Sequence, residues 1–185
     1  MSYDATFDDD LDGYAAGGGY ESAVSWNGSI GNPAAGCVEI NAPAATYNGP
    51  GITKSDSFGS FPNKVWFSYR ITGKTGASAG NAVSFNVTAY FGSPSLYLEL
   101  VIPYEDWATT DTGWIQTYLD IPTPAPGATI TSLYLNFVNC HVTSEALIAY
   151  IDNVSISTSA PPFEAGATFG YSHSAGGIPG AVLVT

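Results

Sequence analysis

The chain has 185 residues, enough for one good hydrophobic core and too few for two comfortable domains. Hydrophobic residues make up 45% of it and charged residues only 11%, which excludes a disordered polyelectrolyte. The formal net charge is −12, so phosphate backbones and anionic membranes would repel the chain. We therefore expect no nucleic-acid partner and no membrane partner, and no apolar run is long enough to cross a bilayer.

Composition and turn pattern together predict an all-β protein. The sequence contains 21 Gly and 12 Pro, which interrupt every helical pattern of apolar residues, and it is rich in Tyr and Phe. Residues 42–63 are expected to form mostly a long loop, with a short strand near 52–57. Strands separated by turn residues are expected at 36–41, 64–72, 82–91, 96–102, 114–121, 129–138 and 147–157.

Four of these strands alternate in a way that assigns their faces, because strand side chains point to opposite sides in turn. One face is aliphatic and aromatic, as the core of a two-sheet sandwich requires. In the first of the four, Val65 and Phe67 are expected inside, and Trp66, Ser68 and Arg70 outside. The outward residues that form our candidate ligand-binding surface are Trp66, Arg70, Asn86, Tyr90, Tyr97 and Tyr134.

The pattern changes near the C-terminus. After residue 159 the chain opens with two prolines, carries one charged residue, Glu164, and ends in the apolar sequence AVLVT. We expect a β-sandwich over residues 1–158 and an extended C-terminal tail over 159–185 that acts as a docking arm on a neighbouring subunit. This predicts a homo-oligomer or a place in a larger particle.

Neither the cysteines nor the N-terminus fixes a compartment. Cys37 and Cys140 could form one disulfide if their strands are adjacent, and two cysteines alone leave this open. The first residues have no basic region followed by an apolar one, so we expect no secretory signal in this chain. We expect an extracellular or virion-surface location, with the signal either removed or not needed.

The order of features resembles the carbohydrate-binding modules of families 4, 9 and 22, which share the galactose-binding-domain-like jelly roll. The match covers about residues 5–157 and leaves the tail outside, and its closing strand is the most specific piece. The resemblance implies an all-β jelly-roll sandwich of two antiparallel sheets. The matching features are, in order, Phe7-Asp8, Gly13-Tyr14, Trp26, the small-residue strand 36–40, the strand Trp66–Ile71, the segment Thr112–Tyr118 and the strand Tyr150–Ile156.

The N-terminal aspartates have the spacing of the opening of a calcium loop. In Asp8-x-Asp10-x-Asp12, alternating carboxylates converge in a tight turn, and the glycine that follows permits the bend. A full EF-hand would need a Glu where Gly19 stands, which excludes an ordinary EF-hand. The resemblance implies instead a structural Ca²⁺ that joins the first and last strands, with Asp152 completing the set. A solvated acidic N-terminus is the alternative.

The candidate surface predicts a non-catalytic glycan-binding domain. Aromatic rings stack on the apolar C–H patches of sugars, while amide and guanidinium groups bind their hydroxyls. The alternative is that these aromatic residues pack under loops, the tail or another subunit. The two histidines, His141 and His173, have no metal-ligand set at suitable spacing, and no nucleophile elbow occurs, so we expect no enzyme.

A second function class stays open at this point. The chain could be a purely structural virion component, such as a bacteriophage capsid decoration, head-fibre or tail protein anchored by its C-terminal tail. Its partner would then be a protein of the same assembly rather than a glycan. Fold alone does not decide between the two classes.

Overall fold

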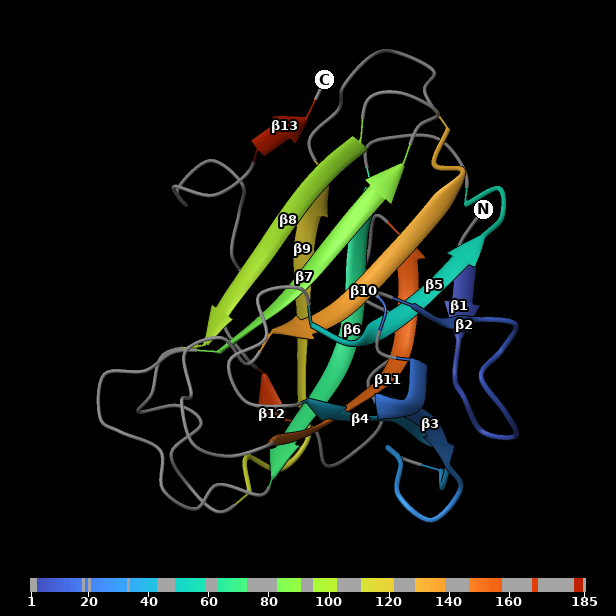
Figure 1. Cartoon of the computed structure of the whole chain (residues 1–185), viewed down its shortest axis with the longest axis vertical. Coiled ribbons are helices and arrows are strands. Elements are labelled where there is room, and N and C mark those ends of the chain that lie inside the picture. The colour runs from blue at the N-terminus through green and yellow to red at the C-terminus, as the bar shows by residue number, and fades with distance from the viewer. Residues whose placement is uncertain are drawn as a thin grey trace.

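The structure is a computed structural model, and Figure 1 shows two sheets lying one behind the other. The residues that it describes are 3–17, 19, 21–32, 34–42, 49–58, 63–72, 83–90, 95–102, 111–121, 129–138, 147–157, 168–169 and 182–184.

Seven strands of the described chain form the first sheet. The long central strand, β11, pairs with β6 on one side and with β4 on the other. Past the end of β4, β1 takes the place beside β11. The strands across the sheet are β12 (Thr168–Phe169), β9 (Ile115–Ile121), β6 (Asn63–Thr72), β11 (Leu147–Ser157), β4 (Cys37–Ala42) and β3 (Val24–Asn27), with β1 (Tyr3–Ala5) on β11.

Six described strands form the second sheet, which lies in front in Figure 1. Successive strands from β5 to β11 cross repeatedly between the two sheets, which is the connectivity of a jelly roll. A single 3-10 turn, η1 (Glu21–Ala23), is the only helical element in the described ranges. The strands across this sheet are β13 (Val182–Val184), β8 (Ser95–Ile102), β7 (Val83–Tyr90), β10 (Ser132–Val138), β5 (Gly51–Ser55) and β2 (Ala15–Gly17).

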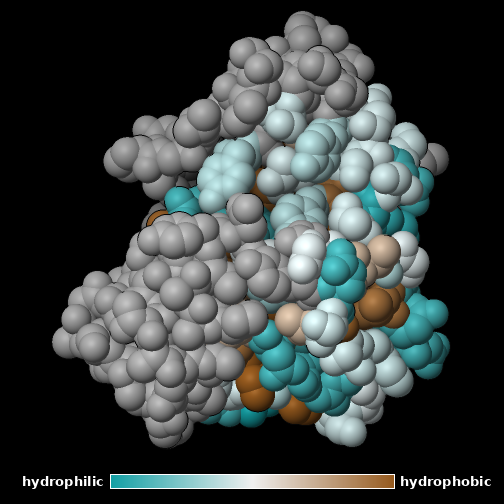
Figure 2. Space-filling view, in the orientation of Figure 1, coloured by the Kyte–Doolittle hydropathy of each residue, from teal (hydrophilic) through white to brown (hydrophobic). Residues whose placement is uncertain are grey.

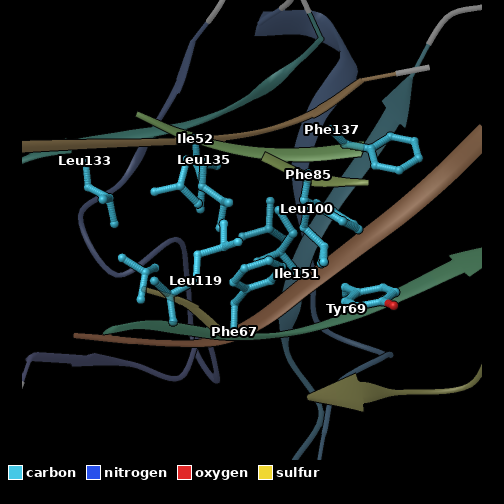
Figure 3. Packing of buried hydrophobic residues seen from close by; sticks show 14 of the residues in the cluster. Ile52, Phe67, Tyr69, Phe85, Leu100, Leu119, Leu133, Leu135, Phe137 and Ile151 are labelled. Carbon is cyan, nitrogen blue, oxygen red and sulfur yellow. The ribbon is translucent and has the colours of Figure 1, made fainter. Parts of the chain in front are cut away.

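The core lies between the two sheets and is built from the alternate residues of each central strand. In β6, Val65, Phe67 and Ile71 are fully buried in it. Phe85 of β7 sits at its centre, with ring centroids 4.9 Å from Phe137 and 5.6 Å from Phe67. Figure 3 shows aliphatic and aromatic side chains from both sheets meeting in one layer. This packing confirms the inward faces assigned from strand alternation.

The expected all-β jelly-roll sandwich is confirmed, and the seven long strands lie within three residues of the expected bounds. The short strand expected near 52–57 is β5. Three short strands at the N-terminal end, β1 to β3, were not expected. Each has only three or four residues, too few for an alternating pattern to stand out in the sequence.

Two short strands of the C-terminal tail are described, and both pair with the same chain. β12 pairs in parallel with β9, and β13 pairs antiparallel with β8, so each extends one sheet at its edge. The division at residue 158 and the docking arm on a neighbouring subunit stay predictions. No helix in the described ranges is long and apolar enough to cross a membrane.

Candidate functional site

The structure divides the six predicted surface residues between the outer faces of two different sheets. Trp66 and Arg70 lie on β6 of the first sheet. The other four, Asn86, Tyr90, Tyr97 and Tyr134, lie on β7, β8 and β10, which are neighbours in the second sheet. The six therefore do not form one surface, and the four that come together define the candidate site.

The register of the second sheet places two tyrosines in one row across it. Tyr97 lies opposite Thr88, and Thr88 lies opposite Tyr134, so all three share the outer face. We call these three residues the tyrosine row. Neighbouring strands are about 5 Å apart, so the Cα atoms of Tyr97 and Tyr134 are separated by roughly 10 Å. Tyr90, one row along, is 39% exposed.

A second row, two residues along each strand, carries polar groups. Glu99 lies opposite Asn86, and Asn86 lies opposite Asn136. We call these three residues the amide row. Glu99 and Asn136 were not among the predicted site residues. Only the strand register, which a single sequence does not give, puts them beside Asn86.

One backbone carbonyl positions members of both rows. The oxygen of Gly49 accepts a hydrogen bond from Tyr134 Oη at 2.9 Å and from Asn136 Nδ2 at 3.3 Å. A Cβ built on Gly17 would meet the Tyr134 ring at 3.4 Å, so the ring lies close above β2. Burial, with smaller contributions from Tyr90 and Glu21, raises the pKa of Tyr134 to about 12, so its phenol stays protonated and donates.

Two buried polar atoms on this face have no hydrogen-bond partner in the described chain. They are Asn86 Oδ1 and Ser84 Oγ, on one strand and two residues apart. Asn86 is only 5% exposed, and a buried acceptor without a partner costs stability unless water or a ligand satisfies it. Figure 2 looks onto this side of the molecule, and its described surface is largely pale or teal, with brown in smaller patches.

Trp66 and Arg70 have different surroundings on the first sheet. Trp66 was expected on an open outer face but is only 7% exposed, and its ring centroid lies 4.5 Å from that of Tyr118. Arg70 forms a two-pronged ion pair with Asp111, in which Nε donates to Oδ1 at 2.9 Å. Its guanidinium carbon also lies 6.0 Å from the Tyr150 ring. Two of the three guanidinium nitrogens of Arg70, Nε and Nη2, therefore already have a protein partner.

The N-terminal aspartates lie near Asp152, at the point where β11 exchanges β4 for β1 as its neighbour. Asp152 is 1% exposed, and its two oxygens accept hydrogen bonds from Asn32 N and Asn153 N, both at 2.7 Å. Asn153 has a left-handed backbone, with φ of 51°, and its side chain donates to Asn32 O. The bulge lies directly after Asp152, which still pairs with Ser68 of β6, and regular pairing resumes at Ser155.

Asp8 and Asp12 act electrostatically on Asp152. Burial raises the pKa of Asp152 to about 7, the backbone hydrogen bonds from Asn32 and Asn153 lower it, and the charges of Asp8 and Asp12 raise it further. We call Asp8, Asp12 and Asp152 the acidic junction.

The loop after β1 is shaped by its own hydrogen bonds and by neighbouring side chains. Asp12 Oδ2 accepts from Phe7 N at 2.7 Å, and Trp26 Nε1 donates to Phe7 O at 2.7 Å. Asp10 instead accepts from Asp12 N at 2.6 Å, as a turn residue does. Phe7 and Asp12 both have left-handed backbones, with φ of 56° and 50°. Two strained residues held in one short loop indicate that the surroundings dictate its shape.

The acidic junction partly fits a calcium ion. Calcium binds six to eight oxygen atoms, and carboxylates that repel one another around a buried position suit a hard cation. In the described chain, however, no three Asp, Glu, His or Cys side chains converge closely enough to hold a metal by themselves. Backbone oxygens or water would have to complete the shell.

Cys37, on the neighbouring strand β4, is a free thiol. Burial, followed by the charge of Asp152, raises its pKa to about 12. Because Cys37 is free, the possible disulfide with Cys140, which lies outside the described residues, is not formed in the structure.

Comparison with known proteins gives matches to solved structures. No family model matches the chain, and no curated protein matches it in sequence. A family 28 carbohydrate-binding module specific for non-crystalline cellulose is similar with a TM-score of 0.64 at 10% identity, over 84% of this chain and 94% of that one. The CBM22-2 xylan-binding domain of Paenibacillus barcinonensis Xyn10C has a TM-score of 0.55 at 17% identity, and the match covers 85% of this chain and 99% of that domain. The mannan-recognising module TmCBM27 has a TM-score of 0.52 at 12% identity, and the match covers 86% of this chain and 99% of that module. At such identities the likeness concerns the fold: the chain has the jelly-roll fold of these carbohydrate-binding modules.

Proposed function

We propose that the chain is a non-catalytic glycan-binding domain and that the outer face of the second sheet is its binding surface. The tyrosine row is the observation that carries this proposal. Two tyrosines whose Cα atoms lie roughly 10 Å apart on one face of the sheet offer two stacking positions for the apolar faces of sugar rings. A ligand that reaches both has to be an oligosaccharide or polysaccharide rather than a single sugar.

The amide row supports the same proposal. Glu99, Asn86 and Asn136 lie beside the stacking positions and carry the polar atoms that recognise hydroxyls. Asn86 and Asn136 are only 5% and 6% exposed, whereas Glu99 is partly exposed. The similar structures described above recognise cellulose, xylan or mannan, which are all polysaccharides. A glycan-binding role would place the protein outside the cell or on a surface.

The first sheet is a weaker candidate. Its two predicted residues, Trp66 and Arg70, are respectively buried and paired with Asp111. Neither is positioned to offer a free stacking face or a free guanidinium.

Affinity electrophoresis and titration calorimetry with cellohexaose, xylohexaose and mannohexaose test the proposed surface. Tyr97→Ala and Tyr134→Ala should each weaken binding of the preferred oligosaccharide at least about tenfold, the loss expected for an aromatic anchor. Tyr118→Ala, a tyrosine on the outer face of the first sheet, is the matched control and should leave the affinity unchanged. Equal losses in all three variants, or none in the first two, would show that the assigned face is wrong.

We further propose that the acidic junction holds a structural Ca²⁺ through Asp152 and one of the two N-terminal carboxylates, Asp8 or Asp12, with backbone oxygens and water completing the shell. The mutual repulsion of these groups around a buried position is the supporting observation. Asp10, which accepts the Asp12 amide, is then a loop-shaping residue rather than a ligand. Ca²⁺ that binds only the folded state should raise the melting temperature as its concentration increases. A melting temperature that is the same in metal-free buffer and in millimolar CaCl₂ contradicts this proposal.

A further inference from the structure

The two tyrosines of the tyrosine row are both partly exposed, but the sheet holds them in different ways. Tyr134 lies on β10, between β7 and β5, and its phenol donates to Gly49 O at 2.9 Å. Tyr97 lies on β8, whose neighbours are β7 on one side and β13 on the other. Without β13, β8 would be the edge strand of the sheet, with its backbone paired along one side only. The C-terminal strand therefore decides whether Tyr97 is an internal residue or an edge residue.

Strand β13 pairs with the part of β8 that carries this tyrosine. The paired positions of β8 are Ser95, Leu96 and Tyr97, and Tyr97 lies opposite Val182. In the described chain no strand pairs with residues 98–102 of β8 on that side. Figure 1 shows β13, in red, beside the end at which β8 begins. The pairing is thus confined to the end of β8 where Tyr97 lies.

Tyr97 also lies close to the end of the ladder that β8 forms with β7. The last pair of that ladder joins Tyr90 to Ser95, two residues before Tyr97. Residues near the end of a ladder open more readily than residues at its centre. A strand on the other side of β8 adds backbone pairing at this point. Pairing with β13 should therefore fix the backbone from which the Tyr97 ring projects.

The register of β13 also widens the candidate binding face. Residues directly opposite each other in an antiparallel pair share a face, so Val182 occupies an outer-face position beside Tyr97. The line that runs through Tyr134, Thr88 and Tyr97 then continues for one more strand, about 5 Å further. The other described strand of the tail, β12, belongs to the first sheet and adds nothing to this face.

We propose that β13 is part of the glycan-binding site and positions Tyr97 for stacking. This inference rests on the proposed function and adds to it the dependence of one stacking position on the C-terminal tail. A chain that lacks β13 should keep the position at Tyr134 and lose most of the contribution of the position at Tyr97.

Deletion of residues 181–185 removes β13, leaves β12 in the chain and tests the proposal. Titration calorimetry with the preferred hexasaccharide should show binding weakened about three- to tenfold, close to the loss expected for an aromatic anchor. If β13 acts through Tyr97, the deletion and Tyr97→Ala are coupled, and the double variant should bind within about twofold of Tyr97→Ala alone. The losses from the deletion and from Tyr134→Ala should instead multiply, which makes Tyr134→Ala the matched control.

The outcomes separate this inference from the proposed function. A wild-type chain that binds none of the three hexasaccharides overturns both. If the wild type binds, an unchanged affinity after the deletion overturns the inference alone. Losses from the deletion and from Tyr97→Ala that multiply do the same, because β13 would then contribute without acting through Tyr97.

Hydrogen exchange in the intact wild-type chain tests the same coupling without a deletion. Because coupling between two sites is reciprocal, a saturating hexasaccharide should slow amide exchange of residues 182–184 about three- to tenfold. Residues 168–169 of β12, on the first sheet, are the control and should exchange at an unchanged rate. Unchanged exchange in β13, or equal slowing in both strands, overturns the proposal even if the shortened chain does not fold.

Discussion

The pH dependence of stability provides a sharp test of the acidic junction. Burial and the charges of Asp8 and Asp12 raise the pKa of Asp152 to about 7 in the folded chain, against an ordinary value of 3.8. Between these two values the folded state binds a proton that the unfolded state has released. The metal-free protein should therefore become less stable as the pH rises from about 4 to about 7, since the buried carboxylate has to ionise.

The size of this effect follows from the shift. The interval between 3.8 and about 7 is about three pH units, and each unit corresponds to about 1.4 kcal/mol, which gives about 4 kcal/mol in all. Calcium would reverse the dependence, because a cation beside Asp152 favours its ionised form. Substitution of Asp152 by Asn removes the ionisable group and should abolish both effects.

Urea unfolding followed by tryptophan fluorescence measures the free energy of unfolding at pH 4.5, 5.5, 6.5 and 7.5. The wild type and Asp152→Asn would each be unfolded in metal-depleted buffer and again with millimolar CaCl₂. The difference in the free energy of unfolding between the two proteins isolates the contribution of Asp152, because the other acidic residues are present in both. A difference that does not change with pH in metal-depleted buffer refutes the electrostatic reasoning. A calcium-induced gain of equal size in both proteins refutes the assignment of Asp152 as a ligand.

Three further substitutions test the packing around the site. Gly49→Ala would place a Cβ 1.7 Å from the Phe137 carbonyl oxygen, so the free energy of unfolding should fall by about 1–3 kcal/mol or more; an unchanged urea midpoint would contradict this close approach. Phe85→Ala empties the centre of the core and should cost about 3–5 kcal/mol in the same assay, whereas a loss below 1 kcal/mol would place Phe85 outside it. Arg70→Ala breaks a partly exposed ion pair with Asp111 and should cost less than about 1 kcal/mol, so a larger loss would indicate a structural role for this pair.

Much of the fold was predictable because the central strands are long. In β6 and β10, apolar and polar residues alternate over seven residues or more, and this pattern fixes both the strand and its buried face. The same reasoning failed for β1 and β2, which have three residues each and gain their stability from pairing rather than from a pattern of their own. Long-range pairing leaves no local trace in so short a segment.

The candidate site was less predictable for a geometrical reason. Alternation separates the inner from the outer residues of a strand, but it does not reveal which sheet a strand joins. Trp66 and Tyr134 therefore looked equivalent in the sequence, although they lie on outer faces of opposite sheets. The roles of Gly49 and Glu99 depend on register and were not accessible either. The virion role and the oligomeric state stay predictions.

The acidic junction and the binding face are connected through one lysine. Lys54 of β5 donates to the backbone oxygen of Asp12 at 2.7 Å, so a strand of the second sheet holds the loop that carries two of the junction's carboxylates. The same loop continues into β2, which pairs with β5 and carries Gly17 beneath the Tyr134 ring. A change in the junction would therefore reach the edge strand under Tyr134 before it reached Tyr97 on β8, which is separated from β2 by three strands. Weakened metal binding should consequently lower glycan affinity mainly through the stacking position at Tyr134, while the position at Tyr97, on β8, is held by its own neighbours β7 and β13.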